Sequence, residues 1–213
     1  ETITIFEQEG ARQLYASING TIVDITGKHN TSVAVGDLHA CAVTGSSLSC
    51  WGREITGALG DGSPVNTNSS TPVTVTSPTG WIPVDVSVNH DATCAIYRNS
   101  TDAKDIYCWG DSWYSGNGAF FGATPDEPED PVQVNGTSFP ILELSSTSSE
   151  LTVAPHDVEE ITMGHYFTCA RSYEGLVKCW GYNYNGQLGI GNATQVGDNL
   201  DEMGEHQAFT DLG

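Results

Sequence analysis

Six cysteines are the residues of this 213-residue chain whose spacing most clearly indicates a chemistry. They fall in three pairs along the chain, and the second member of each pair directly precedes a Trp-Gly dipeptide. Cysteine-based zinc sites use closely spaced Cys-x-x-Cys pairs, which this chain lacks. Because the pairs repeat, we predict three local disulfides and an oxidising compartment. The predicted pairs are Cys41 with Cys50, Cys94 with Cys108, and Cys169 with Cys179.

A second motif points to the same compartment. Six Asn-x-Ser/Thr sequons, none with proline in the middle, are potential N-glycosylation sites: Asn19, Asn30, Asn68, Asn99, Asn135 and Asn192. A single sequon has little meaning in a chain rich in Asn, Ser and Thr, but six together with paired cysteines favour a secreted, extracellular glycoprotein. The chain opens at Glu1 and not at Met, which fits a mature form whose leader has been removed.

Two acidic loops contain the residues suited to bind a cation. Their carboxylates stand at alternating spacing and at nearly the same place in two copies of a repeat, and Ca²⁺ prefers oxygen ligands of this kind. Neither loop matches a known calcium motif, so a solvated acidic loop is the competing interpretation. The candidate calcium ligands are Asp126, Glu127, Glu129, Asp130, Asp198, Asp201 and Glu202.

No catalytic constellation is evident. The six histidines are scattered, and His39 and His165 each lie just before a cysteine-bearing strand, where packing or backbone hydrogen bonding is expected. No G-x-S-x-G elbow or H-E-x-x-H helix occurs, and the glycine-spaced loops follow Trp-Gly, where they serve turns. We predict that the protein is not an enzyme and that it has no cofactor other than the calcium considered above.

The charge of the chain limits its partners. Seven Lys plus Arg stand against 27 Asp plus Glu, for a net charge of −20. Such a surface repels phosphate backbones and anionic lipids, which excludes nucleic acid and membrane surfaces as expected partners. No run of about 20 apolar residues occurs, so no membrane insertion is expected. The acidity also keeps a protein soluble in a salty or calcium-bearing medium.

Short strands must position these residues. Apolar runs are brief, Gly, Pro, Ser and Thr recur, and helical periodicity is absent, which predicts an all-β fold of antiparallel strands. The best copy of the repeat, residues 164–192, predicts a hairpin with a cross-strand disulfide, followed by Trp-Gly and a glycine-spaced loop. Asn89 stands where the other copies have Gly36 and Gly164, which predicts a left-handed backbone at that place.

The copies divide the chain into four parts. These are residues 1–32, an N-terminal strand and degenerate hairpin; 33–83, repeat 1; 84–155, repeat 2 with an insertion; and 156–213, repeat 3. In the first part, Thr2–Phe6 alternates like a strand, and Leu14–Ile25 predicts a hairpin around Asn19-Gly20. In repeat 1, a solvated loop is expected over Ser63–Thr71 and a strand over Pro72–Thr76.

The combined pattern G-x-x-H-x-C-A-V … C-W-G … G-x-L-G-x-G … P-x-x-V resembles the regulator of chromosome condensation repeat family over roughly residues 33–213. The resemblance implies a β-propeller with about one four-stranded blade per repeat, and the cysteine-bearing form is similar to secreted members. The motif histidine is His39, but Ala92 and Phe167 replace it in the other copies. Three clear repeats plus a degenerate one predict an incomplete propeller.

These observations predict a non-catalytic secreted glycoprotein scaffold that associates with other copies of itself, as a closed ring or an extracellular filament, because uncovered blades and sheet edges are sticky. The alternative is an extracellular binding or inhibitor module whose loops engage a protein or glycan. For that alternative, the contact residues would be exposed aromatic side chains such as Trp113-Tyr114 and Phe120-Phe121.

Overall fold

The computed structural model describes residues 3–7, 14–18, 21–24, 31–63, 67–110, 132–133, 158–173, 175–197, 209–210 and 212. All regular structure in these ranges is β, and all strand pairs are antiparallel. They hold no helix that could cross a membrane. The strands are β1 (Ile3–Glu7), β2 (Leu14–Ile18), β3 (Thr21–Asp24), β4 (Thr31–Val35), β5 (His39–Thr44), β6 (Ser47–Gly52), β7 (Ser69–Thr74), β8 (Ile82–Val88), β9 (Ala92–Arg98), β10 (Lys104–Gly110), β11 (Val132–Gln133), β12 (Val158–Met163), β13 (Phe167–Ser172) and β14 (Val177–Gly181).

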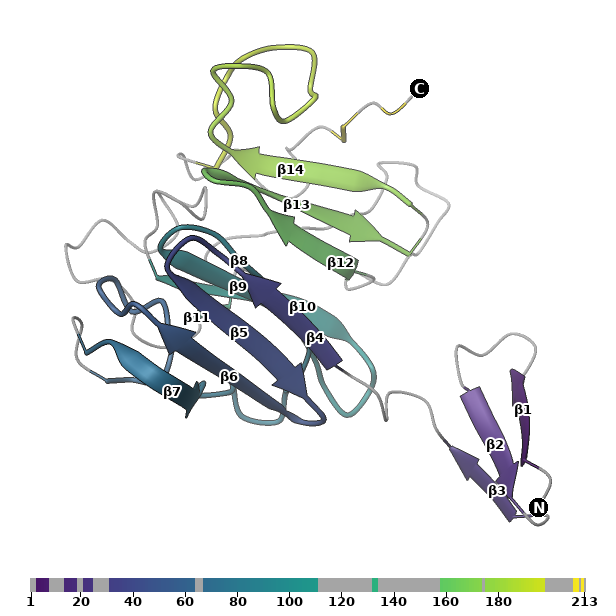
Figure 1. Cartoon of the computed structure of the whole chain (residues 1–213). Helices are drawn as coiled ribbons and strands as arrows, with labels where there is room; N and C mark the ends of the chain where they lie inside the picture. The colour runs from purple at the N-terminus through teal and green to yellow at the C-terminus, as the bar shows by residue number, and fades with distance from the viewer. Residues whose placement is uncertain are drawn as a thin grey trace.

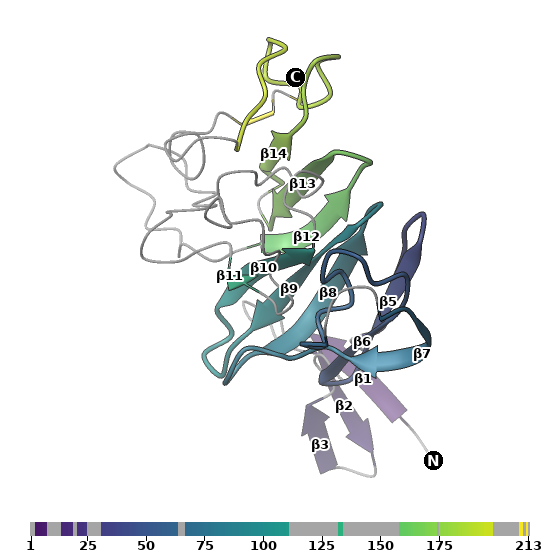
Figure 2. The same cartoon turned by 90° about the vertical axis from the view of Figure 1, so that its left-hand side faces the viewer.

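Three of the four sheets are the blades of a propeller (Figures 1 and 2). Blade 1 is β4–β7, blade 2 is β8–β11 and blade 3 is β12–β14, each with its strands side by side in chain order. Blade 2 lies between the other two, and its first strand contacts the first strands of both. An isolated bridge between Gly181 and Val196 lies where a fourth strand of blade 3 would pair. The described sheets do not close into a ring, so the predicted all-β, incomplete propeller is confirmed.

The blades pack through two different faces, because side chains alternate along a strand. The face with the disulfide of blade 1 packs on the face of blade 2 that carries Trp109, and both belong to one buried cluster. The disulfide face of blade 2 packs in the same way on the face of blade 3 that carries Trp180. Both tryptophans are fully buried. Burying a large side chain stabilises a fold by about 2–3 kcal/mol, so this contact is the repeated source of cohesion.

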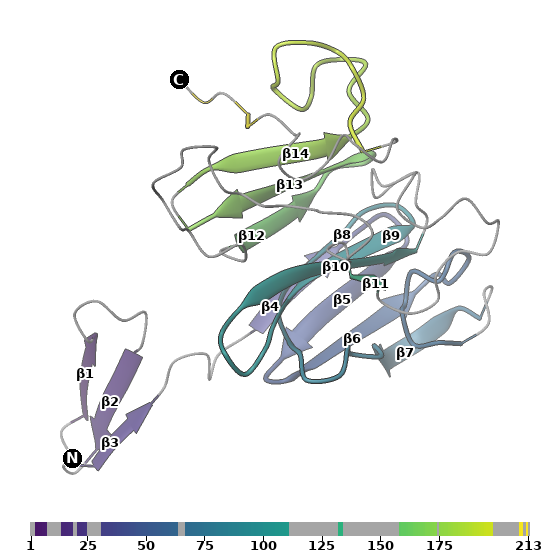
Figure 3. The same cartoon turned by 180° about the vertical axis from the view of Figure 1, so that it is seen from behind.

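The N-terminal strands form a separate sheet, β1-β2-β3. Ile18 pairs with Thr21 in the hairpin of β2 and β3, and the predicted turn residues Asn19 and Gly20 lie outside the described residues. The strands of this sheet contact one another and none of the described strands of the blades. Figure 3 shows the sheet to one side of the blades.

The outer strand of blade 1 starts earlier than the sequence predicts. β7 begins at Ser69, so the last part of the expected solvated loop is strand, and the strand ends at Thr74, before the expected end. A register shift between Cys50 and Gly52 lets Gly52 pair with Ser69. Pro72 is compatible with this position because β7 is an edge strand, where a missing N–H costs no ladder bond.

The prediction of a left-handed backbone at Gly36, Asn89 and Gly164 is wrong. The only non-glycine residue with positive φ in the described ranges is Asp102, and neither glycine has a positive φ. Gly36 is needed for a different reason: a Cβ there would collide with the backbone oxygen of Asn89 in blade 2. At Gly36 the reason for glycine is therefore close approach between blades, whereas at Gly164 a Cβ would collide with the ring of Phe167 in the same blade.

Candidate functional site

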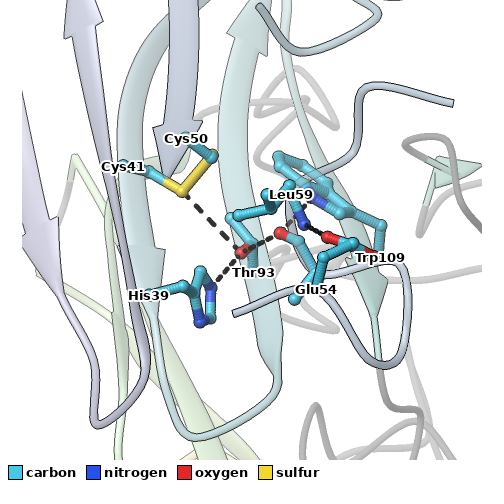
Figure 4. The surroundings of a disulfide bond; sticks show 8 residues. His39, Cys41, Cys50, Glu54, Leu59, Thr93 and Trp109 are labelled. Atoms are coloured by element: carbon cyan, nitrogen blue, oxygen red, sulfur yellow. Dashed lines mark hydrogen bonds between the residues drawn. A yellow bond between two sulfur atoms is a disulfide. The ribbon is translucent and has the colours of Figure 1, made fainter. Parts of the chain in front are cut away.

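A buried polar joint connects blade 1 to blade 2 (Figure 4). His39 starts β5 and Thr93 lies on β9, and their side chains meet with Nε2 2.7 Å from Oγ1. The Thr93 hydroxyl also lies 3.9 Å from the sulfur of Cys41, within the disulfide of blade 1. Both His39 and Thr93 are buried. The joint thus places a polar contact, rather than an apolar one, beside the disulfide.

Proton counting decides the direction of these hydrogen bonds. The Thr93 hydroxyl has one proton, which it donates to the carbonyl oxygen of Ala58 over 2.9 Å. It must therefore accept the proton on Nε2 of His39, which makes His39 the Nε2–H tautomer. Nδ1 of His39 is then an acceptor, and it has no hydrogen-bond partner among the described residues. Burial lowers the pKa of His39 to about 4, outweighing the opposing influence of Asp91, so the ring is neutral at pH 7.

The glycine-spaced loop between β6 and β7 of blade 1 completes the joint. The indole nitrogen of Trp109 donates to Ala58, and the carboxylate of the buried Glu54 accepts a 2.7 Å bond from the backbone amide of Leu59. In repeat 3 the amide oxygen of Asn183 accepts from Leu188 over 2.9 Å in the same way. These loops are therefore turns, as the sequence predicted, and in each a buried side-chain oxygen accepts a backbone amide.

Two kinds of loop meet at one end of the blades. In blades 1 and 3, the turn after the first strand lies beside the loop that follows the Trp-Gly strand. In blade 1 the backbone N–H of Arg53 donates to the backbone oxygen of Leu38 over 2.9 Å. In blade 3 the backbone N–H of Tyr182 donates to the backbone oxygen of Tyr166 over the same distance. We call the side chains gathered there the end surface. It comprises Asp37, Leu38, Ile55, His90, His165, Tyr166, Tyr182 and Tyr184.

Equivalent positions of the three repeats converge on this surface. Asp37, His90 and His165 occupy the same place in repeats 1, 2 and 3. The ring centroids of His90 and His165 are 5.5 Å apart, and Nδ1 of His165 lies 3.5 Å from the Asp37 carboxylate. The end surface is therefore continuous across the first turns of all three blades. His165 was predicted to pack or to bond to the backbone, yet its side chain is about half exposed.

Tyrosines extend the surface over blade 3. Tyr166 lies 4.0 Å from His165 between ring centroids, then Tyr182 lies 5.8 Å from Tyr166 and Tyr184 lies 4.9 Å from Tyr182. Tyr184 is 68% exposed, and Tyr166 is exposed as well. Exposed tyrosines combine apolar area with a hydroxyl and are typical of binding surfaces.

Sequence reasoning missed this tyrosine cluster. The sequence predicts that G-H-Y-F begins a cysteine-bearing hairpin and that G-Y-N-Y-N belongs to a glycine-spaced loop, and it predicts no binding surface at either. The available signal was that each of these tyrosines lies within three residues of the end of a strand, in loops that a hairpin must bring to the same side. The side chains of the end surface can make apolar contacts and hydrogen bonds. The described residues hold no group of three or more His, Cys, Asp or Glu side chains able to hold a metal ion.

The predicted cysteine pairs are the pairs that the structure forms: Cys41–Cys50, Cys94–Cys108 and Cys169–Cys179. In each case the two cysteines are directly opposite in the register of neighbouring strands. No free cysteine remains. Each bridge therefore joins the second and third strands of its blade.

The other predicted site residues are only partly described. Asn68 and Asn192 are exposed and Asn99 is half-buried, whereas Asn19, Asn30 and Asn135 lie outside the described residues. All seven candidate calcium ligands also lie outside them: Asp126, Glu127, Glu129, Asp130, Asp198, Asp201 and Glu202. The aromatic pairs Trp113-Tyr114 and Phe120-Phe121 lie outside them too.

Comparison with known proteins agrees with the repeat. Residues 158–187 match the profile of the "Regulator of chromosome condensation (RCC1) repeat". The ultraviolet-B receptor UVR8 of Arabidopsis thaliana is 28% identical over 161 residues, which cover 75% of this chain and 31% of that protein. The chain thus spans about a third of the length of this curated relative.

One solved structure shares the fold over most of this chain. The human WBSCR16 structure aligns with a TM-score of 0.52 and 16% identity over 83% of this chain and 40% of that one. Yeast RCC1 (Prp20), solved with Kap60, aligns with a TM-score of 0.42 and 19% identity over 76% of this chain and 47% of that one. The predicted resemblance to the regulator of chromosome condensation (RCC1) repeat family is confirmed, because residues 158–187 match its repeat.

Proposed function

We propose that the chain is a non-catalytic, secreted glycoprotein scaffold that associates with other copies of itself through the faces of its blades. One observation carries this proposal. Val33 and Val35 of β4 are 69% and 76% exposed, on the face of blade 1 that also carries Trp51. The equivalent residues Val86 and Val88 of blade 2 are buried against blade 1. Val33 and Val35 therefore resemble the residues that pack between blades, but no described blade covers them.

A second copy offers the complementary surface. Within the chain, the tryptophan face of one blade is covered by the disulfide face of the blade before it. The disulfide face of blade 3 carries Phe167, Cys169 and Val177, which are half-buried. A head-to-tail contact between copies would repeat the packing that already occurs twice. Such a heterologous contact closes a ring where the rotation permits and otherwise builds a filament.

Secretion and glycosylation are parts of the same proposal. Three disulfides with no free cysteine are typical of an oxidising compartment. In each described sequon, the side-chain oxygen accepts a backbone amide: Asn68 from Glu54, Asn99 from Thr101 and Asn192 from Thr194. These bonds engage the oxygen and not the nitrogen to which a glycan would be attached. Mass spectrometry of the secreted chain before and after amidase treatment tests glycosylation site by site.

Light scattering coupled to gel filtration tests self-association, with the glycan mass subtracted. We expect a mass at least twice that of one chain for the wild type. Val33→Asp with Val35→Asp should give a single-chain mass, because charge on this face opposes burial. Tyr173→Asp is the control, since Tyr173 is 54% exposed but lies at the turn after β13. A single-chain mass for the wild type at working concentration would refute self-association.

The second candidate function is an extracellular binding or inhibitor module. The exposed tyrosines of the end surface favour it, since tyrosine is enriched at the energetic centres of protein interfaces. Val33→Asp with Val35→Asp separates the two candidates: self-association should fail, while binding through the end surface should persist.

A further inference from the structure

We infer that the end surface is the docking site for a protein partner that presents positively charged and apolar side chains. The inference deepens the second candidate function and rests on it, because it names the surface and the kind of partner. It does not depend on self-association, whose contact uses the valine face of blade 1.

The first support is the concentration of exposed apolar side chains at this end. Eight large hydrophobic side chains are exposed among the described residues, and four of them belong to the end surface. These are Leu38, Ile55, Tyr166 and Tyr184, supplied by blades 1 and 3. Two more, Val33 and Val35, belong to the valine face already described. Gathered exposed apolar side chains mark an interaction site, whereas scattered ones do not.

The second support is the order within the surface. His165 contacts both Asp37 and His90, and Tyr166 contacts both His165 and Tyr182. Rings held by neighbours lose little conformational entropy when a partner docks, which favours binding. Because the contacts run across all three blades, the surface matches an extended partner such as a folded protein or a peptide.

The third support is charge. Five of the seven basic residues are described, and each is already engaged. Four lie beside carboxylates, and Lys178 is buried with its ammonium over the ring of Phe209; the four are Arg53, Arg98, Lys104 and Arg171. The net charge is −20, so the field of the chain attracts cations.

Within the end surface, Asp37 is the carboxylate best placed to meet a cationic group. Its side chain is 59% exposed, and its carboxylate lies 3.5 Å from Nδ1 of His165. The neighbouring carboxylate of Asp91 is largely buried. It already accepts a hydrogen bond from His90 and lies beside Arg53. An Arg or Lys side chain of a partner would pair with Asp37 while its apolar neighbours cover the tyrosines.

A peptide-display selection tests this inference. The full, disulfide-bonded chain is immobilised, and a phage library of random 16-residue peptides is panned on it. The strongest peptides are synthesised, and their dissociation constants are measured by biolayer interferometry. We expect them to combine Arg or Lys with aromatic or aliphatic residues. Their affinity should fall at least tenfold for Tyr166→Ser with Tyr184→Ser, fall for Asp37→Asn, and weaken as salt rises.

Tyr173→Ser is the matched control, because it removes another exposed tyrosine from blade 3 but leaves the end surface intact. The unfolding temperature of each variant shows that it is folded. Equal binding to the wild type and the double tyrosine variant would overturn the inference but leave the binding function standing. Selected peptides without net positive charge would overturn the partner class. Failure to enrich any peptide would overturn both the inference and the binding function.

Discussion

The indole nitrogen of Trp109 in blade 2 donates a 2.9 Å hydrogen bond to the carbonyl oxygen of Ala58 in the loop between β6 and β7 of blade 1. The hydroxyl of Thr93 donates to the same oxygen over 2.9 Å. Both lone pairs of one carbonyl are therefore used by the next blade. This relationship explains why the repeat couples a cysteine, a Trp-Gly pair and a glycine-spaced loop: all three are parts of one inter-blade joint.

Gly60→Ala should destabilise the fold much more than Gly45→Ala. The two glycines have nearly the same φ, +63° and +65°, so the backbone strain of substitution is similar. A Cβ at Gly60 would lie 2.5 Å from the Trp109 indole nitrogen, whereas a Cβ at Gly45 would meet no atom within 4 Å. We expect about 1–3 kcal/mol of additional loss for Gly60→Ala, from urea unfolding. Equal losses of unfolding free energy would show that packing of Trp109 against residue 60 does not stabilise the loop.

Thr93→Val should cost about 1–3 kcal/mol, because it leaves the buried Nε2–H of His39 without an acceptor. Trp109 still satisfies the oxygen of Ala58, so the loss should be confined to the His39 side of the joint. Thr44→Val is the control, since Thr44 is an exposed strand residue. Urea unfolding of both variants at pH 7 provides the comparison. A loss no larger than that of the control would mean that the hydrogen bond is energetically neutral.

Acid should destabilise the chain through His39. Its pKa is about 4 in the folded state against 6.5 in the unfolded chain, so the unfolded state binds the proton more tightly between these values. Above pH 6.5 the neutral His39 ring makes its full contribution to the free energy of unfolding, and this contribution is lost as pH falls from 6.5 to 4. The loss is on the order of 3 kcal/mol.

The change His39→Phe isolates this effect, because Phe167 fills the equivalent place in repeat 3. Unfolding free energies of wild type and variant are measured from pH 7 to pH 4. As pH falls, the unfolding free energy of the wild type should decrease more than that of the variant. The other histidines are present in both proteins, so their contribution cancels in the difference. Parallel pH profiles would show that His39 takes up its proton as readily when folded.

Removing a disulfide should cost about 2–4 kcal/mol per bridge. The bridges close segments of 9, 14 and 10 residues, so loop-closure entropy predicts the largest loss for Cys94→Ala with Cys108→Ala. Cys41→Ala with Cys50→Ala is the matched comparison. Thermal unfolding with and without reductant gives the losses. Alkylation of thiols in the native, unreduced wild type would contradict all three bridges.

The local part of this structure was predictable from the order of residues. Alternation and turn residues predicted the hairpins, and the repeat predicted which cysteines pair, because each pair stands at facing positions of one hairpin. The glycine-spaced loops were predictable as turns, since their glycines adopt positive φ, as at Gly57 and Gly186. These features depend on residues close together in the chain, and the steric limits between such residues follow directly from the local sequence.

Only the tertiary structure decided what lies between blades. The sequence pattern could not show that Gly36 makes room for the backbone of blade 2, or that Asp37 and His165, from repeats 1 and 3, lie together. It also gave no means of telling exposed Val33 from buried Val86, which occupy equivalent places in their repeats. Burial and contact at these sites depend on which surface another blade covers, and that is a property of packing over long range and not of the repeat itself.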